Sequence, residues 1–137
     1  MANNLQIGVM VDSFRLSTKE GIRKAAEIGA KGVQIYAVAG EFTPENLTAA
    51  DIREYRSLLD SEGLAVSALC GDLGGHGFTD PAEIPNTIER SRRIAHLCAE
   101  LGGKVYTVDA NTALYTIAIE NATAYEIGSF RGSVITK

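Results

Sequence analysis

Short apolar runs alternate with amphipathic helical patterns from residue 7 to about residue 108. The apolar runs cover residues 7–11, 33–37, 64–70 and 104–108, and they are rich in β-branched residues, as buried parallel strands are. Each stretch between two runs has apolar residues at helical spacing, so one face of each helix can cover a sheet. This alternation predicts an α/β fold built from repeated βα units.

The helices are delimited by clear start and stop signals. Three capping boxes are predicted, in which a polar side chain precedes an acidic residue by three positions: Ser17 with Glu20, Thr48 with Asp51, and Asn86 with Glu89. Glycine closes each helical pattern, at Gly29, Gly63 and Gly102. Residues 26–31 and 99–104 are nearly the same sequence, which also indicates repeated units.

Composition restricts the class of protein. The chain has 137 residues, 45% of them hydrophobic, enough for one core, and we expect a single domain, 1–137. The net charge of -4 and the lack of a basic run argue against nucleic-acid binding. No apolar run has the length of a membrane span, so a cytoplasmic protein without membrane contact is expected. Cys70 and Cys98 lie in apolar patterns and are interpreted as small buried hydrophobic residues.

A glycine-rich loop follows the third apolar run and holds polar side chains. Residues 67–78 read SALCGDLGGHGF, so Asp72 and His76 come directly after a strand, and Asp12 follows the first strand. Carboxyl ends of parallel strands are where such folds bind small molecules. Asp12, Asp72 and His76 are therefore candidate substrate-binding residues, and His76 is also a candidate catalytic residue because imidazole titrates near neutrality. Asp72 can equally cap the turn, and Asp12 can cap the loop before Ser17.

Several of these segments resemble one family. Residues 7–14 (IGVMVDSF), 25–36 (AAEIGAKGVQIY), 67–78 and 91–103 (SRRIAHLCAELGG) are similar to the xylose isomerase-like TIM barrels known as sugar phosphate isomerases/epimerases. The resemblance implies a (βα)8 barrel that isomerises or epimerises a small sugar or sugar phosphate with a divalent metal, Mn²⁺ or Mg²⁺. Residues 117–121 (IAIEN) are similar to the family's fifth strand, which implies that Glu120 is a metal ligand and a catalytic acid or base. Glu120 can equally be a solvated residue at the end of a hairpin.

The tail departs from the family pattern. A complete barrel of this type has about 250 residues. Here the segment after the fourth apolar run has no room for a helix. Residues 109–112 instead predict a hairpin turn, and further strands are expected at 114–119, 125–130 and 133–136. The predicted fold is half of a (βα)8 barrel (1–108) with a short antiparallel β-rich tail (109–137), which fits a deletion, a recombined sequence or a designed one.

These observations favour a barrel segment without catalytic activity alone, because the family's remaining metal ligands lie on strands six to eight and have no matching positions here. For the isolated chain no cofactor is expected. One alternative is an isomerase whose site is completed by oligomerisation. A flavodoxin-like binding module is another, although residues 12–17 lack a glycine-rich phosphate loop. Open sheet edges predict a homodimer with a largely apolar interface.

Overall fold

The computed structural model describes residues 5–74 and 80–103, together with the backbone of strands between residues 105 and 135. The elements follow in the order β1 (Gly8–Met10), a 3₁₀ helix η1 (Val11–Phe14), α1 (Thr18–Glu27), β2 (Gly32–Tyr36), α2 (Ala49–Ser61), β3 (Ala65–Cys70) and α3 (Ile84–Glu100). The strands β4 (Val105–Asp109), β5 (Ala113–Ala118), β6 (Thr123–Arg131) and β7 (Val134–Ile135) complete the described chain.

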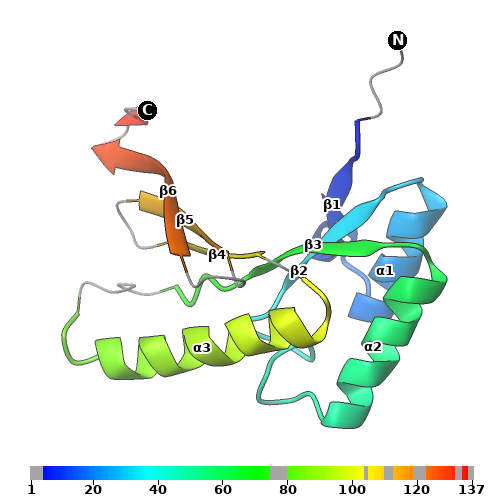
Figure 1. Ribbon diagram of the computed structural model, residues 1–137, viewed down its shortest axis with the longest axis horizontal. Coiled ribbons are helices and arrows are strands. Elements are labelled where there is room, and N and C mark those ends of the chain that lie inside the picture. The colour runs from blue at the N-terminus through cyan, green and yellow to red at the C-terminus, as the bar shows by residue number, and fades with distance from the viewer. Residues whose placement is uncertain are drawn as a thin grey trace.

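The described strands form one sheet in sequential order, β1 to β7. β1, β2, β3 and β4 pair in parallel, whereas β4 to β7 pair antiparallel. The three α-helices lie on the same side of the parallel strands (Figure 1). This is the predicted arrangement of parallel βα units followed by an antiparallel tail. A flavodoxin-like module has a strand order of 2-1-3-4-5 and helices on both faces of its sheet, so the observed order contradicts that alternative.

The core lies between the helices and one face of the sheet. Val33 and Ile35 of β2 are 0% and 1% exposed, and they pair in register with Val66 and Leu69 of β3. Side chains alternate between the two faces of a strand, so Gln34 and Tyr36 lie on the face away from the helices. Ser67 is the extra residue of a β-bulge in β3, and its hydroxyl donates a hydrogen bond to the carbonyl of Val33, 2.9 Å away.

Two predicted helix starts are confirmed and one is wrong. The Ser17 and Thr48 capping boxes are both formed, with each acidic side chain accepting from its cap backbone N–H. Asn86 does not cap α3, because the helix already begins at Ile84 with Pro85 in its first turn. The fixed φ of proline suits that position, so the helix starts earlier than the Asn86 and Glu89 pattern predicts.

Glycines at the ends of the helices adopt the left-handed conformation. The φ angles of Gly29, Gly63 and Gly102 are +86°, +67° and +79°, which a side chain would disfavour. The helices therefore stop at the residues that the sequence predicts. No helix in the described part of the chain combines the length and the apolar content needed to cross a membrane.

Candidate functional site

Polar side chains meet at the carboxyl ends of β1, β2 and β3. Asp12 follows β1 within η1, and its Oδ2 atom accepts a hydrogen bond from the backbone N–H of Tyr36, 3.0 Å away. Tyr36 is the last residue of β2 and pairs in register with Cys70, the last residue of β3. Because the strands are parallel, these ends lie at the same edge of the sheet. We call Asp12, Tyr36, Cys70 and Asp72 the strand-end cluster.

Tyr36 has the clearest electrostatic perturbation in this cluster. Burial raises the pKa of its phenol, and the negative charges of Cys70, Asp72 and Asp12 raise the pKa further. The phenol therefore stays protonated at neutral pH. In that state the hydroxyl can donate a hydrogen bond to a ligand oxygen, but it is not a base.

Asp72 forms the turn that the sequence allows for it. Its Oδ1 atom accepts a hydrogen bond from the backbone N–H of Gly74, 2.9 Å away, as in an Asx turn. The side chain is half-buried and close enough to Tyr36 to affect the pKa of the phenol. Asp12, by contrast, does not cap its own loop with its side chain but connects the end of β1 to the end of β2.

The other predicted residues are divided between described and undescribed parts of the chain. His76 and Glu120 lie outside the described residues, so their predicted roles stay predictions. Cys98 is buried as predicted, at 0% exposure, whereas Cys70 is only half-buried. Sequence reasoning missed Tyr36, although its position at the end of an alternating strand was the available signal. Within the described part, no three His, Cys, Asp or Glu side chains are grouped as metal ligands.

The sequence profile of the xylose isomerase-like TIM barrel family matches residues 22–128, which include three of the parallel strands. This chain belongs to that family. The resemblance predicted from the sequence is therefore confirmed, and the match continues past residue 108 into the segment that the sequence predicted to depart from the family pattern. A search of curated proteins finds no match.

Solved structures have the same fold over part of their length. A xylose isomerase-like TIM barrel/4-hydroxyphenylpyruvate dioxygenase fusion protein has a TM-score of 0.57 and 18% identity, over 76% of this chain and 16% of that one. The probable 3-DHS dehydratase AsbF of Bacillus anthracis has a TM-score of 0.57 and 19% identity, over 76% of this chain and 38% of its own. A sugar phosphate isomerase/epimerase of Parabacteroides distasonis has a TM-score of 0.54 and 17% identity, over 79% of this chain and 41% of its own. This family member therefore spans less than half of each of these structures.

Proposed function

We propose that this chain provides the amino-terminal half of the substrate site of a sugar phosphate isomerase or epimerase of the xylose isomerase-like family. The strand-end cluster is the observation that carries this proposal, because it lies at the edge where α/β barrels bind their substrates. Membership of the family supports the reaction class. We further propose that the chain is inactive alone, since it has four of the eight parallel strands in its described part.

The cluster is suited to holding a hydroxylated ligand. The neutral phenol of Tyr36 can donate to a sugar oxygen, and the carboxylate of Asp12 keeps lone pairs that can accept from sugar hydroxyls. The hydrogen bond from the backbone N–H of Tyr36 holds the Asp12 carboxylate at the end of β2, beside the residue that carries the phenol. In this proposal they bind and orient the substrate, whereas proton transfer depends on groups contributed from elsewhere.

A divalent metal is expected for the complete family site, but the described residues do not fit one. They include no group of three candidate ligands, and Asp12 and Asp72 each accept a backbone N–H. No step is therefore assigned to a metal. The predicted ligand Glu120, a cytoplasmic location, and the origin of residues 109–137 stay predictions from the sequence.

Ligand-observed NMR with a panel of aldose and ketose phosphates tests the proposal. Saturation transfer to at least one sugar should be seen with the wild-type chain. The affinity for that sugar should fall about tenfold or more in Asp12→Ala, because this variant loses a charged hydrogen-bond partner. Asp60→Ala, an exposed carboxylate at the end of α2, is the matched control and should leave binding unchanged. Equal binding by the wild type and Asp12→Ala would contradict the assignment of the site.

The same samples test the proposed lack of activity. With Mn²⁺ present in D₂O, the chain alone should incorporate no deuterium into the bound sugar, because the proton-transfer groups are incomplete. Deuterium incorporation that is lost in Glu120→Ala would show instead that the chain is an active isomerase. The alternative of a site completed by oligomerisation is favoured by exposed apolar residues on β1 and just before it, and would require activity that rises with protein concentration.

A further inference from the structure

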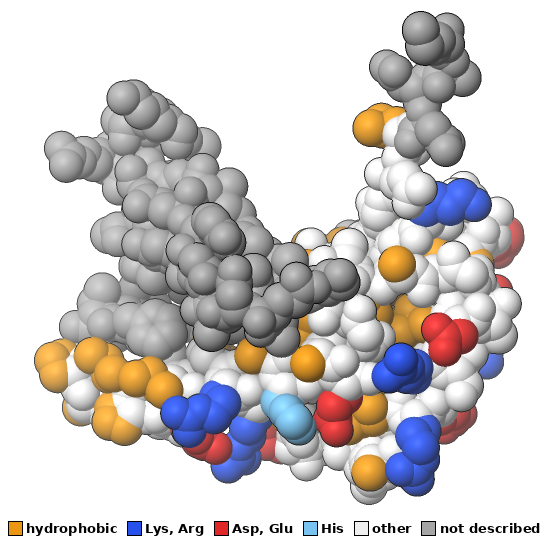
Figure 2. Space-filling model, in the orientation of Figure 1, with side chains coloured by type: hydrophobic (Ala, Val, Ile, Leu, Met, Phe, Trp, Pro, Cys, Tyr) orange, Lys and Arg blue, Asp and Glu red, His pale blue; other side chains and the backbone are white. Residues whose placement is uncertain are grey.

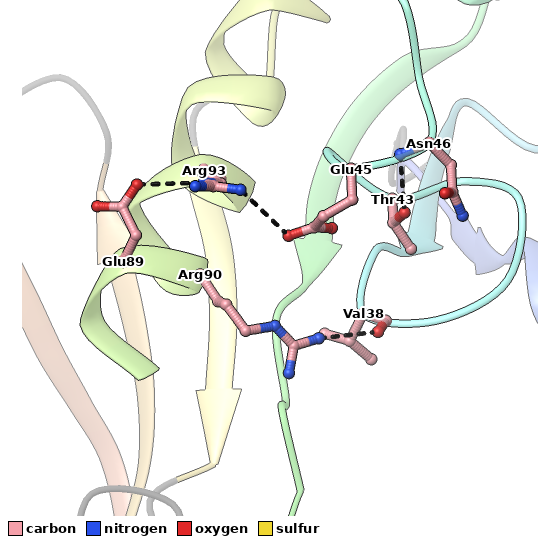
Figure 3. A network of polar contacts seen from close by, with 7 residues as sticks. All are labelled: Val38, Thr43, Glu45, Asn46, Glu89, Arg90 and Arg93. Atoms are coloured by element: carbon pink, nitrogen blue, oxygen red, sulfur yellow. Dashed lines mark hydrogen bonds and ion pairs between the residues drawn. The ribbon is translucent and has the colours of Figure 1, made fainter. Parts of the chain in front are cut away.

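A polar cleft lies between the loop that joins β2 to α2 and the first half of α3 (Figure 3). Its volume is about 440 Å³, within the range of small-molecule sites. It is separate from the strand-end cluster in its lining residues, which are Val38, Ala39, Gly40, Thr43, Glu45, Asn46, Asn86, Glu89, Arg90 and Arg93. The loop begins at the carboxyl end of β2, so the cleft opens near the same edge of the sheet as Tyr36.

α3 presents four polar side chains to this cleft, Asn86, Glu89, Arg90 and Arg93. Asn86, Arg90 and Arg93 are four and then three residues apart, a spacing that places them in line along a helix. Arg90 is half-buried, and its Nη2 donates a hydrogen bond to the carbonyl of Val38, 3.3 Å away. That bond holds the guanidinium across the cleft (Figure 3).

The other charged side chains of the cleft are connected by ion pairs. The Nε atom of Arg93 lies 3.1 Å from Oε1 of Glu89, and its Nη1 atom lies 4.0 Å from Oε1 of Glu45. Glu89 also pairs with Arg92, on the outside of the helix, at 3.1 Å. The lining of the cleft itself has two glutamates and two arginines, so its formal charges balance. Among the described residues, the ion pairs include Arg93 but not Arg90, so the guanidinium of Arg90 faces the cleft without a carboxylate partner.

Hydroxyl and amide groups line the same cleft as Arg90. Thr43 is 5% exposed, and its oxygen accepts a hydrogen bond from the backbone N–H of Asn46, 3.3 Å away, which leaves the hydroxyl proton able to donate to a ligand. Asn86 adds a side-chain amide from α3. A rigid guanidinium fork with nearby hydroxyl and amide donors is suited to the oxygens of a phosphate group.

We propose that this cleft is a phosphate-binding subsite anchored by Arg90. It takes the phosphate of a small phosphorylated ligand, while the rest of the ligand extends toward the strand-end cluster. The carbonyl of Val38 accepts the hydrogen bond from Arg90, and Val38 follows Tyr36 by two residues. One short segment of backbone therefore connects the cleft with the strand-end cluster. The sugar part of this inference rests on the proposed function, whereas the phosphate part does not.

Titration of the full chain with inorganic phosphate, followed by ¹⁵N-resolved NMR of the backbone and the arginine Nε groups, tests the subsite. Sodium chloride at matched ionic strength is the salt control. Saturable shifts centred on Arg90, Val38 and Thr43 are expected, with a dissociation constant on the order of 1 mM for a single anchoring arginine. The absence of saturable shifts would overturn the proposal.

Three variants make the test specific. Arg90→Met should weaken phosphate binding at least about tenfold, and Arg90→Lys should weaken it less, because lysine keeps the charge but loses the fork. Arg53→Met removes the same charge from an exposed position of α2 that does not line this cleft, and it should have no effect. Equal weakening in Arg53→Met would mean general electrostatic attraction and would overturn the subsite.

Three further outcomes are decisive. If Arg90→Met does not fold in thermal unfolding, unchanged phosphate binding by Arg90→Lys would overturn the role of the guanidinium fork, and weaker binding would support it. Acetate that binds as tightly as phosphate would overturn the assignment to phosphate. Since no metal or turnover is required, phosphate binding at Arg90 without any sugar contact to Asp12 would support the subsite while the proposed function fails.

Discussion

Tyr36 connects the local geometry of the strand ends to a measurable titration. Its phenol is half-buried, and three groups that can carry negative charge act on it from η1, the end of β3 and the loop after β3. All three oppose ionisation of the phenol, as burial does. The folded-state pKa is therefore above the ordinary value of about 10. The raised pKa of Tyr36 contributes to the stability of the folded state at pH values below the ordinary pKa. This contribution is lost as pH rises through the folded-state pKa.

We predict that Asp72→Asn lowers the pKa of Tyr36 only part of the way to its ordinary value, because burial is the larger cause of the shift. The measurement is an alkaline titration of the ¹³Cζ resonance of Tyr36. Asp60→Asn, far from the strand ends on α2, is the control and should leave the titration unchanged. An unchanged Tyr36 pKa in Asp72→Asn would show that the charge of Asp72 does not reach the phenol.

A second prediction at the level of a single residue concerns Ser17. Its hydroxyl accepts from the backbone N–H of Glu20, and Glu20 accepts from the hydroxyl and backbone N–H of Ser17 in return. Ser17→Ala should lower the free energy of unfolding by about 1 kcal/mol, the usual effect of losing a helix cap. Ser57→Ala, at an exposed position inside α2, should not destabilise the protein in the same denaturant experiment.

The pH dependence of the same variant follows from Glu20. Hydrogen bonds from Ser17 hold the pKa of Glu20 below its usual range. Such a carboxylate contributes stability above its unfolded-state pKa and loses that contribution as pH falls through the folded-state pKa. The acid-induced loss of stability should therefore be smaller in Ser17→Ala than in the wild type, and an equal loss would contradict the capping box.

At the level of the elements, α1 packs unusually closely on η1. A Cβ atom added at Gly21 would lie 2.6 Å from Cγ1 of Val11 and 3.2 Å from its carbonyl oxygen, and Val11 is buried. Alanine is favoured over glycine in a helix by about 1 kcal/mol. The overlap should outweigh that gain, because overpacking a core typically costs about 1–3 kcal/mol.

We therefore predict that Gly21→Ala destabilises the chain in denaturant unfolding, although it improves helix propensity. Gly8→Ala is the comparison variant, since the nearest atom to its added Cβ is 3.4 Å away, an ordinary contact. A Gly21→Ala protein more stable than the wild type would mean that α1 can move away from η1 at little cost.

Local signals predicted most of the elements, and contacts between distant residues explain what they missed. The positions of the strands, the ends of the helices and the antiparallel tail follow from apolar periodicity, caps and turns. The start of α3 was predicted too late because Pro85 permits an earlier turn, and Glu89 pairs with Arg92 and Arg93 instead of Asn86. The contact between Asp12 and Tyr36 spans 24 residues and depends on the pairing of β1 with β2, so no local pattern reports it.

For the whole molecule, the sheet face away from the helices includes polar side chains on the described strands β2 and β3. Val33, Ile35 and Val66 are buried under the helices, so the opposite face has neighbouring residues such as Gln34 and Ser67. Figure 2 shows charged side chains of both signs intermingled on the visible surface. The exposed apolar residues instead include Leu5, Ile7 and Met10, at 78%, 58% and 43% exposure, on β1 and just before it.

The metal content of the whole chain is a further prediction. If Glu120 alone remains of the family's ligand set, Mn²⁺ or Mg²⁺ should bind no better than to any acidic surface, because a competent site needs several protein ligands. Isothermal titration calorimetry should then show no saturable binding. Micromolar binding that is lost in Glu120→Ala and kept in Glu100→Ala would contradict this prediction.

The assembly of the chain is the last prediction, and it concerns β1. Among the described strands β1 pairs only with β2, so its other edge offers backbone N–H and C=O groups next to exposed apolar side chains. An edge of this kind favours pairing with a second chain. We expect a homodimer formed through β1, with a twofold axis as the simplest closed arrangement.

Sedimentation velocity at high micromolar concentration distinguishes the homodimer from the monomer. Ile7→Lys should shift the wild-type dimer toward a monomer of 14.6 kDa, because a charge directly before the edge strand opposes pairing. Ile28→Lys is the matched control: Ile28 is 55% exposed, close to the 58% of Ile7, but it follows α1 instead of preceding the edge strand. If both variants dissociate equally, the interface is not at β1. A monomeric wild type would mean that the β1 edge remains unpaired in solution, and any activity of the chain would then depend on a different polypeptide to complete the site.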